Sequence, residues 1–470
     1  MPDAALIERF IDITGRPNVL TVEDDLTHYV EENRFIYVGK TELVLKPNST
    51  EQVSQILTLA NETNTPVVPQ GGHTGHAGGG VPDESGEQII VSLERMNKIR
   101  DIDTAGNTLT AEAGVILQTI QETADANDRL FPLSIGSQAS CQIGGNISSN
   151  AGGTGVLAYG NTRELVLGLE AVLPNGEIWN GLRRLKKDNT GYSLKNLFIG
   201  AEGTLGVVTA AVLKLFPKPK GQNVVWVALE SPNDALSLLN LAQGMAGAAL
   251  TGFELIHRTP LEYVLRNIPG SRDPMEEPHE WYVLAEISSG RSADDADALT
   301  EAIFTEALDR GLAKDAVMAQ SGAQRDAFWK LREDMGPAQI PEGGSIKHDI
   351  SVPVHAIPDF VARASEIVLD EIADARICAF GHMGDGNLHY NVSQPAGGDR
   401  EAFLEHRQSI NDKVHALVVE MDGSISAEHG IGRLKRESMA KVKSQTEMEM
   451  MRAVKNAFDP KGIMNPGKVL

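Results

Sequence analysis

The sequence predicts an α+β protein with two large domains. At 470 residues, the chain is longer than one ordinary hydrophobic core can serve. The charged, proline-rich segment Pro217–Gly221 marks a boundary between two halves of different pattern. Before it the pattern is βαβ-like. After it, strands alternate with helices packed on one side, which favours an α+β plait over a doubly wound sheet.

Charge and composition exclude several classes of protein. The 64 acidic and 42 basic residues give a net charge of −22, which argues against nucleic acid or an anionic membrane surface as a partner. A hydrophobic content of 41% and 46 glycines are typical of a globular enzyme. Cys141 and Cys378 have no CxxC companion and are expected to be free, buried thiols. No signal peptide or transmembrane segment is predicted, so we expect a cytoplasmic protein.

The first half begins with a mixed, mainly helical segment at residues 1–37. A βαβ-like run follows, with a strand at 43–47, a helix at 49–63 and a strand at 65–68; Ser49 or Thr50 is the expected N-cap, and Val53, Ile56, Leu57 and Ala60 form the apolar helix face. Strand-rich runs at 88–96 and 109–117 precede a helix at 118–128. Asn175-Gly176 lies between two β-rich runs and predicts a hairpin turn.

The glycine-rich loop Pro69–Gly80 follows the strand at 65–68. Glycine allows close approach of the backbone to a ligand, and successive N–H groups in such a loop form a nest for anions, above all phosphates. A flexible linker is the alternative, but linkers are usually Gly/Ser-rich with polar flanks, and this loop has neither. Its histidines, His73 and His76, also raise the possibility of a metal site.

A second tract rich in glycine and asparagine spans Pro132–Thr162. It is too small and polar to pack a core, and a long tract of this kind inside a domain is usually functional. The second half then alternates strands and helices. Its strands are expected at 223–229, 248–256, 280–288, 346–354 and within 376–393, and its helices at 231–245 (with Ser231 as N-cap), 294–311, 322–335, 357–372 and 400–421.

Two histidines flank a glycine turn in the second half. A turn at 384–387 would fold the flanking strands into a hairpin and bring His382 and His389 onto one face, within reach of a common ion. With Glu428 as a third ligand, two imidazoles and a carboxylate are typical of a catalytic metal site. Because the spacing matches no standard motif, two surface-loop histidines are the alternative.

His429 follows Glu428 directly. Neighbours on a strand point to opposite faces, so His429 is not expected to share the ion. Its imidazole is a candidate general base. Arg332 and Lys347 are candidate cations for a substrate carboxylate, with Arg332 bidentate and Lys347 a point charge. The alternative is a solvated helix face and a strand-end charge.

Long motifs across the chain resemble a known family. PQGGHTG, IGGNISSNAGG and KDNTGYSLKNLFIGAEGTLGVVT are similar to the flavin-binding half of vanillyl-alcohol-oxidase type FAD enzymes. GHMGDGNLHYN, SAEHGIG and DPKGIMNPGKVL resemble the C-terminal half of FAD-dependent D-2-hydroxy-acid dehydrogenases. The likeness, from about Thr41 to Leu470, is greatest to the D-2-hydroxyglutarate dehydrogenases, followed by FAD-linked D-lactate dehydrogenases and glycolate oxidase flavin subunits.

The resemblance implies an FAD-binding domain of two subdomains at 1–217, with a core from about residue 38. It implies an α+β plait domain for substrate and metal at 222–425, and a C-terminal segment at 426–470 that returns to the flavin. The implied cofactor residues are Pro69, Gly71, Gly72, His73, Thr74, Gly75, Gly78, Pro132, Gly136, Ser137, Ser140, Gly144, Gly145, Asn150, Gly153, Glu202, Gly203, Gly206, Val208 and Asn465.

The resemblance also implies the chemistry. The expected reaction is oxidation of a D-2-hydroxy acid, foremost D-2-hydroxyglutarate, by hydride transfer to non-covalent FAD. His429 is the implied base, and a divalent metal, expected to be zinc, is bound by His382, His389 and Glu428. The substrate is bound by Arg332, Lys347 and Asn391. The implied electron acceptor is not NAD but an electron-transfer flavoprotein or a quinone, and a homodimer is suggested.

Two positions depart from the family pattern. Where close relatives have a small polar residue, this chain has His73, and other branches of the superfamily attach FAD covalently through a histidine near this loop. Gly336 replaces a threonine that the hydroxyglutarate enzymes offer the distal carboxylate, which leaves D-malate or D-lactate open as substrate. An oxidase, a non-catalytic flavin subunit of a glycolate-oxidase-like complex and a zinc hydrolase are the rival functions.

Overall fold

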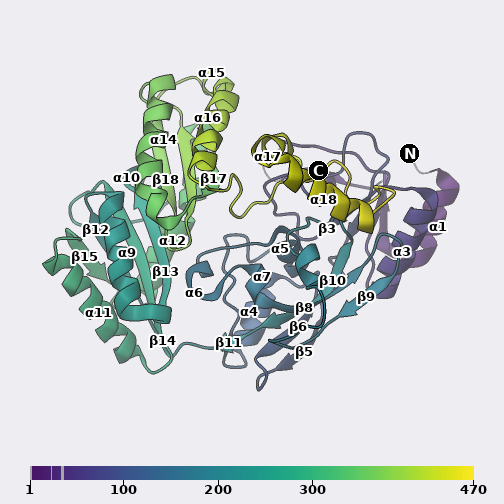
Figure 1. Ribbon diagram of the computed structural model, residues 1–470, viewed down its shortest axis with the longest axis horizontal. Helices are drawn as coiled ribbons and strands as arrows, with labels where there is room; N and C mark the ends of the chain where they lie inside the picture. Colours follow the sequence, from purple (N-terminus) through teal and green to yellow (C-terminus); the bar gives the residue numbers. More distant parts are fainter. Residues whose placement is uncertain (1–2, 23, 33–35) are drawn as a thin grey trace. The chain divides into compact units, whose positions relative to one another are not determined.

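The computed structural model describes residues 3–22, 24–32 and 36–470, and its chain divides into two units (Figure 1). The first unit combines residues 1–152, 160–218 and 428–470, and the second combines 153–159 and 219–427. The last 43 residues therefore return to the unit formed by the N-terminal half. Residues 153–159, which the sequence assigned to the first domain, belong to the second unit.

Three sheets form the framework of the first unit. A four-stranded sheet has the order β1-β2-β4-β3, a five-stranded sheet the order β5-β6-β10-β8-β9, and β7 pairs with β11. These strands are β1 (Val19–Thr21), β2 (Leu43–Leu45), β3 (Val67–Gln70), β4 (Ile89–Ser92), β5 (Ile99–Asp103), β6 (Thr108–Glu112), β7 (Arg129–Leu130), β8 (Val166–Val172), β9 (Ile178–Gly181), β10 (Val207–Lys214) and β11 (Phe216–Pro217).

The helices of the first unit are mostly short. They are α1 (Ala4–Thr14), α2 (Thr27–Val30), α3 (Thr50–Thr63), α4 (Leu117–Asp125), α5 (Ile143–Ser149), α7 (Thr162–Leu165), α8 (Lys195–Phe198), α17 (Arg436–Val442) and α18 (Gln445–Phe458), with a 3₁₀ turn, η1, at Arg16–Asn18. The segment predicted as helical at 1–37 thus also contains β1; residues 1, 2, 23 and 33–35 of that prediction lie outside the described residues.

The predicted βαβ unit is confirmed. The side chain of Ser49 accepts a hydrogen bond from the Gln52 N–H and caps α3, whose buried face includes all four predicted apolar residues. Strands β2, β3 and β4 are parallel neighbours of mainly buried apolar residues, which is the pattern of a sheet covered on both faces. The predicted turn at Asn175-Gly176 joins β8 and β9 in an antiparallel hairpin.

The second glycine-rich tract contains more helix than its composition suggests. Residues 143–149 form α5, which ends at Asn150 in the left-handed conformation, and residues 156–159 form α6 (Val156–Tyr159) of the second unit. Glycines weaken an isolated helix by about 1 kcal/mol each. Here, however, α5 packs against β6 and β10, so tertiary contacts override the local propensity.

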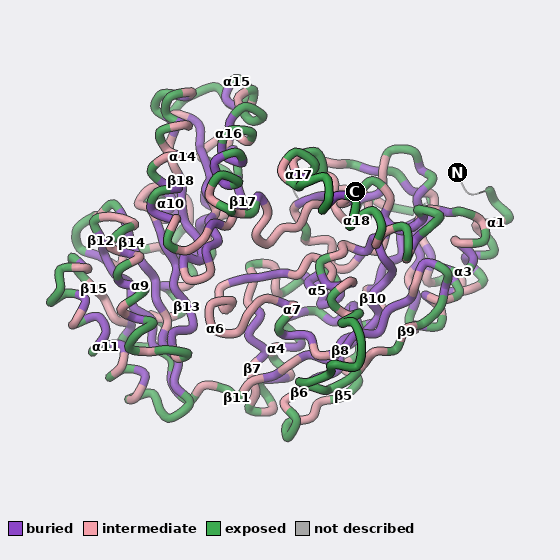
Figure 2. The backbone as a smooth tube through the Cα atoms, viewed as in Figure 1, coloured by how far each residue is buried: buried purple, intermediate pink, exposed green. Residues whose placement is uncertain are grey.

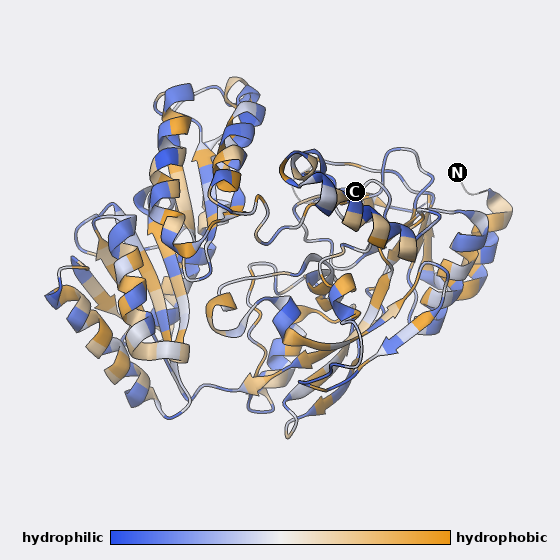
Figure 3. Cartoon of the chain, in the orientation of Figure 1, coloured by the Kyte–Doolittle hydropathy of each residue, from blue (hydrophilic) through white to orange (hydrophobic). Residues whose placement is uncertain are grey.

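A single eight-stranded antiparallel sheet organises the second unit, in the order β15-β12-β14-β13-β18-β19-β16, with β17 also paired to β19. Apart from the edge strand β15, its strands are buried along most of their length (Figure 2), and the sheet is rich in apolar residues (Figure 3). They are β12 (Gly221–Leu229), β13 (Leu250–His257), β14 (Trp281–Ser289), β15 (Asp315–Met318), β16 (Ser345–Ile346), β17 (Asp349–Ser351), β18 (Arg376–His382) and β19 (Asn387–Ser393).

Helices cover the large sheet. Those after α6 are α9 (Pro232–Ala246), α10 (Arg258–Asn267), α11 (Ala293–Asp309), α12 (Gly322–Glu333), α13 (Met335–Ala338), α14 (Ile357–Glu371), α15 (Arg400–Glu405) and α16 (Arg407–Glu420), with 3₁₀ turns η2 (Gly247–Ala249), η3 (Ile340–Glu342) and η4 (Val354–Ala356). As Figure 1 shows, α9 lies beside α11 and α14 beside α16. Ser231 caps α9, as predicted.

Two predictions in the second unit need correction. The strand expected at 346–354 is two short strands, β16 and β17, that leave Lys347 and His348 between them; both strands pair with β19. The helix expected at 400–421 is interrupted at His406, between α15 and α16. Cys141 and Cys378 are buried free thiols, as expected. Within the described residues, no helix has the length and apolar character needed to cross a bilayer.

Candidate functional site

A cavity of about 1030 Å³, a volume that includes its open mouth, lies among the glycine-rich segments of the first unit. The loop after β3, the start of α5, the segment before β10 and the imidazole of His429 line it together. Of the predicted cofactor residues, the cavity wall contains Pro69, Gly71, Gly72, His73, Thr74, Gly75, Gly78, Gly144, Gly145, Glu202, Gly203, Gly206 and Val208.

The other predicted cofactor residues lie outside the lining. They are Pro132, Gly136, Ser137, Ser140, Asn150, Gly153 and Asn465. Gly153 belongs to the second unit, and Asn150 accepts a hydrogen bond from the Arg163 N–H through Oδ1. Sequence reasoning missed three lining amides: Gln70 in the glycine-rich loop, and Gln142 and Asn146 in the second tract that it singled out.

The glycines of the cavity serve two different needs. A Cβ on Gly72 would lie 2.2 Å from the backbone oxygen of Ser140, so at this position glycine lets two backbone segments pack together. A Cβ on Gly75 or Gly145 would meet no atom within 4 Å. Those two positions therefore keep space open at the wall, as a ligand cradle requires.

His429 lies at the cavity wall with a second histidine behind it. The rings of His76 and His429 meet edge to face, with centroids 5.0 Å apart. His76 comes from the same loop as the lining glycines, and both histidines belong to the first unit. The sequence considered His76 only as a metal ligand, because the folding of residues 430–432 against this loop cannot be seen from spacing.

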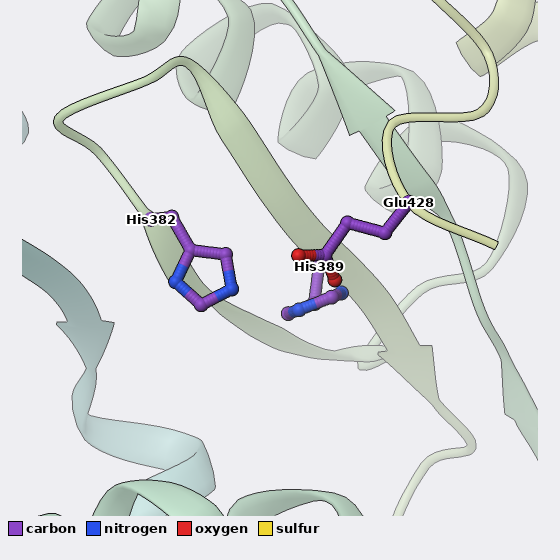
Figure 4. Close-up of side chains that lie close together, drawn as sticks. All are labelled: His382, His389 and Glu428. Atoms are coloured by element: carbon purple, nitrogen blue, oxygen red, sulfur yellow. The ribbon is translucent and has the colours of Figure 1, made fainter. Parts of the chain in front are cut away.

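The predicted hairpin of β18 and β19 is present. Phe380 pairs with His389 in the antiparallel register, and the rings of His382 and His389 are 5.7 Å apart between centroids. Figure 4 shows the two imidazoles and the carboxylate of Glu428 turned toward one another. Each of the three offers a ligand atom, and these atoms lie within 4.8 Å of one another. Glu428 directly follows Ala427, whose N–H donates to the Asp349 carbonyl.

Sequence reasoning missed Glu254, a fully buried carboxylate on β13. Its Oε1 lies 2.6 Å from Nδ1 of His382, and its Oε2 accepts a hydrogen bond of 2.8 Å from Nε of Arg332. Burial raises the pKa of Glu254, but its electrostatic interactions and hydrogen bonds with His382 and Arg332 outweigh that effect and lower the pKa to about 2. Glu254 is therefore ionised at neutral pH.

Arg332 lies in the last turn of α12 and is itself buried. Its guanidinium lies 4.7 Å above the ring centre of Phe380, and its Nη2 has no hydrogen-bond partner among the described residues. Lys347 is exposed between β16 and β17. Asn391 is buried two residues after His389 and donates to Gln339 Oε1 at 3.1 Å. A Cβ on Gly336 would meet no atom within 4 Å.

Comparison with known proteins decides the family. A model of FAD-linked oxidases, C-terminal domain, matches residues 218–469, and a model of an FAD binding domain matches residues 41–181. The chain belongs to the FAD-linked oxidase family. This result confirms the family that the motifs indicated, as well as the prediction of an FAD-dependent dehydrogenase that acts on a CH–OH group.

Several relatives of this FAD-linked oxidase are similar over nearly the whole chain. It is 37% identical to the mitochondrial D-2-hydroxyglutarate dehydrogenase of Arabidopsis thaliana, with 100% of this chain and 82% of the relative covered. It is 37% identical to the D-2-hydroxyglutarate–pyruvate transhydrogenase of Saccharomyces cerevisiae, covering 100% and 95%. The D-2-hydroxyglutarate dehydrogenase of Xanthomonas citri pv. viticola is 36% identical, covering 95% and 92%.

Solved structures establish the fold of this FAD-linked oxidase. Substrate-bound p-cresol methylhydroxylase matches 99% of the chain with a TM-score of 0.77 at 17% identity, and 96% of that protein is covered. Alkyldihydroxyacetonephosphate synthase matches 99% of the chain with a TM-score of 0.75 at 16% identity, and 85% of it is covered. The predicted fold, α+β with an FAD-binding domain of vanillyl-alcohol-oxidase type, is confirmed.

The cavity of this FAD-linked oxidase fits the chemistry of a flavin nucleotide. The side-chain oxygens Oε1 of Gln142 and Oδ1 of Asn146 are buried and have no hydrogen-bond partner among the described residues. A buried acceptor without a donor is costly, and a ligand that brings N–H or O–H groups would satisfy it. The isoalloxazine N3–H and the ribityl hydroxyls of FAD are such donors.

Glu202 joins three segments around this cavity. Its carboxylate accepts hydrogen bonds from the N–H groups of Ile431 at 2.7 Å and Gly432 at 2.8 Å. Asn465 donates through Nδ2 to the Glu202 carbonyl at 2.8 Å and to the Gly79 carbonyl at 2.9 Å. Burial raises the pKa of Glu202, although the two N–H groups oppose the rise. Its φ of +50° is unusual for glutamate and indicates that the surroundings enforce this conformation.

His73 also has a left-handed backbone, with φ of +56°. Its Nε2 lies 2.6 Å from the Glu31 carbonyl oxygen, so Nε2 carries the proton and donates it. Burial lowers the pKa of His73, and the bond to the carbonyl opposes that change. The ring of His73 is thus held by the chain itself at the cavity wall.

Proposed function

We propose that this FAD-linked oxidase oxidises D-2-hydroxyglutarate to 2-oxoglutarate. The relatives named for D-2-hydroxyglutarate support the substrate at 36–37% identity. The observation that carries the chemistry is the place of His429, whose imidazole lines the same cavity as the glycine loop. A base beside the bound flavin is what oxidation of an alcohol at neutral pH requires.

His429 acts as the general base in this proposal. It takes the proton of the substrate hydroxyl, while the C2–H bond breaks and its electron pair leaves as hydride, so that the C2–O bond becomes a carbonyl. Bound FAD supplies the two-electron acceptor for that hydride. The residues of the chain bind and orient the substrate, and His76 supports the ring of His429 from behind.

We further propose a divalent metal, zinc, at His382, His389 and Glu428. Two neutral imidazoles and one carboxylate suit such an ion and leave coordination positions for substrate. A Lewis acid there would supply stabilisation for the developing alkoxide. Arg332 binds the distal carboxylate through its free Nη2 side, Lys347 adds a positive charge, and Asn391 contacts the substrate or its metal shell.

The flavin is proposed to be non-covalent. The hydrogen bond between His73 Nε2 and the Glu31 carbonyl argues against attachment at that nitrogen, because a covalent bond at Nε2 would displace it. Reoxidation is assigned to an electron-transfer flavoprotein or a quinone. A homodimer and a cytoplasmic location remain predictions from the sequence.

An anaerobic stopped-flow experiment tests the proposal. D-2-hydroxyglutarate, D-malate, D-lactate, glycolate and the L-enantiomers are mixed with the oxidised flavoprotein, with and without a chelator, and flavin bleaching is followed. We expect the fastest bleaching with D-2-hydroxyglutarate and a loss of bleaching with the chelator. Equal rates with both enantiomers, or no bleaching by any hydroxy acid, would contradict the proposal, and the second result would favour a non-catalytic flavin subunit of a larger complex.

A different D-2-hydroxy acid is the second candidate. Gly336 leaves open space where a side chain could contact the distal end of the substrate. Gly336 also lacks the hydroxyl of the threonine that the hydroxyglutarate enzymes offer the distal carboxylate. Both features favour D-malate or D-lactate. The same panel ranks these acids directly.

A further inference from the structure

Glu254 links the proposed metal site with the proposed substrate clamp. It lies on β13 directly opposite His382 of β18, in the register Glu254↔His382. Its side chain has no exposed surface, and its strand neighbours Phe253 and Leu255 are buried apolar residues. A carboxylate in such a place is stable only when both of its oxygens have partners.

Each carboxylate oxygen of Glu254 has a different functional partner. Oε1 is 2.6 Å from Nδ1 of His382, and Oε2 is 2.8 Å from Nε of Arg332. His382 is a proposed metal ligand, and Arg332 is the proposed clamp for the substrate carboxylate. The two partners come from β18 and α12, and 128 and 78 positions separate them from Glu254.

We propose that Glu254 is a positioning residue that holds the metal ligand His382 and the carboxylate clamp Arg332 in one hydrogen-bonded chain. The inference rests on the metal site of the proposed function and deepens it. Because a carboxylate is acceptor-only, His382 carries its proton on Nδ1 and presents the lone pair of Nε2 to an ion. A carboxylate behind a ligating histidine fixes the tautomer and raises the basicity of the ligand.

The same bond restricts Arg332. Its Nε edge is occupied by Glu254, and its guanidinium plane rests on the ring of Phe380. The buried Nη2 of Arg332 remains, and it has no hydrogen-bond partner in the part of the chain that the structure describes. A ligand carboxylate would therefore meet Arg332 through its terminal nitrogens, in an orientation that Glu254 and Phe380 set before the ligand arrives.

A purely structural ion pair is the competing explanation, and it predicts a loss of stability without a specific loss of ligand binding. Glu286 on β14 offers a matched control. It is a carboxylate of the same sheet, partly rather than fully buried, and its oxygens accept hydrogen bonds from Trp329 Nε1 at 3.0 Å and Thr251 Oγ1 at 2.8 Å. Glu286→Gln therefore disturbs the sheet without touching His382 or Arg332.

The test compares wild type, Glu254→Gln and Glu286→Gln as metal-stripped proteins with FAD bound. Zinc dissociation constants are measured by competition with a chromogenic chelator, and KM is measured for D-2-hydroxyglutarate after zinc is restored. In Glu254→Gln one carboxylate oxygen is replaced by an amide N–H₂ group. That group must face one of the two donors, Nδ1–H of His382 or Nε–H of Arg332. We expect zinc affinity to fall by about 10–100-fold and KM to rise, and we expect neither change in Glu286→Gln.

The outcomes separate this inference from the proposed function. A wild type that binds no stoichiometric zinc overturns the metal site and the role of Glu254 together. A wild type that binds zinc and a Glu254→Gln variant with the same affinity overturns the role of Glu254 alone. If Glu254→Gln does not fold, Glu254→Asp, which keeps the charge and shortens the reach, is expected to show the same losses in milder form; unchanged affinity and KM in that variant would contradict the inference.

Discussion

His76 and His429 meet edge to face with their ring centroids 5.0 Å apart, which brings the loop after β3 against the residues that follow Glu428. Only His429 reaches the cavity, while His76 lies behind it. The structure therefore distinguishes the two histidines, which sequence spacing could not: His429 is the proposed base at the cavity wall, and His76 packs against its ring.

Replacement of His429 by Asn is expected to slow flavin reduction by D-2-hydroxyglutarate by about 100-fold to 10,000-fold, because a positioned base is lost. FAD should remain bound, since one side chain at the wall contributes little to its retention. Anaerobic stopped-flow absorbance gives the rate, and the visible spectrum gives the FAD content. His76→Asn is the control and should have a much smaller effect; equal losses in both variants would contradict the assignment of the base.

Glu202→Ala should destabilise the first unit and weaken FAD binding. The N–H groups of Ile431 and Gly432 lose their acceptor, and each unsatisfied buried group costs about 1–3 kcal/mol. Chemical denaturation and FAD titration measure the two effects. Glu84, 70% exposed and 3.3 Å from Arg433, provides the control variant Glu84→Gln, which should behave as wild type. Wild-type FAD affinity in Glu202→Ala would show that the residue does not organise the cavity.

Two glycine substitutions should affect different properties, one the stability of the fold and the other the affinity for FAD. Gly72→Ala places a methyl group against the Ser140 backbone and should destabilise the fold by about 1–3 kcal/mol. A Cβ at position 145 would have no atom of the described residues within 4 Å, apart from its own helix backbone and chain neighbours, so the melting temperature of Gly145→Ala without FAD should match wild type. Its FAD affinity should fall because the methyl group enters the cavity. Tight FAD binding by Gly145→Ala would place the cofactor elsewhere.

Removal of the metal should abolish substrate oxidation while FAD stays bound, since the proposed ligands do not line the cavity of the first unit. His389→Asn should lower the zinc content measured by plasma emission spectrometry. The control variant is His406→Asn. Nδ1 of His406 lies 3.1 Å from a carboxylate oxygen of Glu371, but His406 is not a proposed metal ligand. Equal zinc content in all three proteins would disprove the ligand assignment.

Lys468 makes stability depend on pH. It is 3% exposed, and burial lowers its pKa from 10.5 to about 8 despite the attraction of Asp83. A folded-state pKa below the unfolded one means that the charge opposes folding below pH 8 and that this penalty disappears between pH 8 and 10.5. The separation of the two values corresponds to about 3 kcal/mol. Urea titrations of Lys468→Met should show greater stability than wild type at pH 7, and the difference should shrink toward pH 10.5; a constant difference would contradict this account.

Much of the fold could be predicted because its signals are local. Ser49 and Ser231 cap helices through bonds to residues three positions on, and Asn175-Gly176 forms its turn within a few residues. The hairpin of β18 and β19 follows from the glycine turn between two apolar runs. Local signals failed in α5, where packing stabilises a helix of glycine and serine, and at Lys347, where a strand is interrupted.

By itself, the sequence determined the family, the fold class, the glycine loop at the cavity and the histidine hairpin, since each depends on residues close together in the chain. Only the tertiary structure placed Glu254 between His382 and Arg332. It alone also brought the carboxylate of Glu202 to the N–H groups of Ile431 and Gly432. Those partners lie 78 to 230 positions apart. The order of strands in a sheet and the return of the chain terminus bring them together, and no periodicity or spacing rule encodes that order.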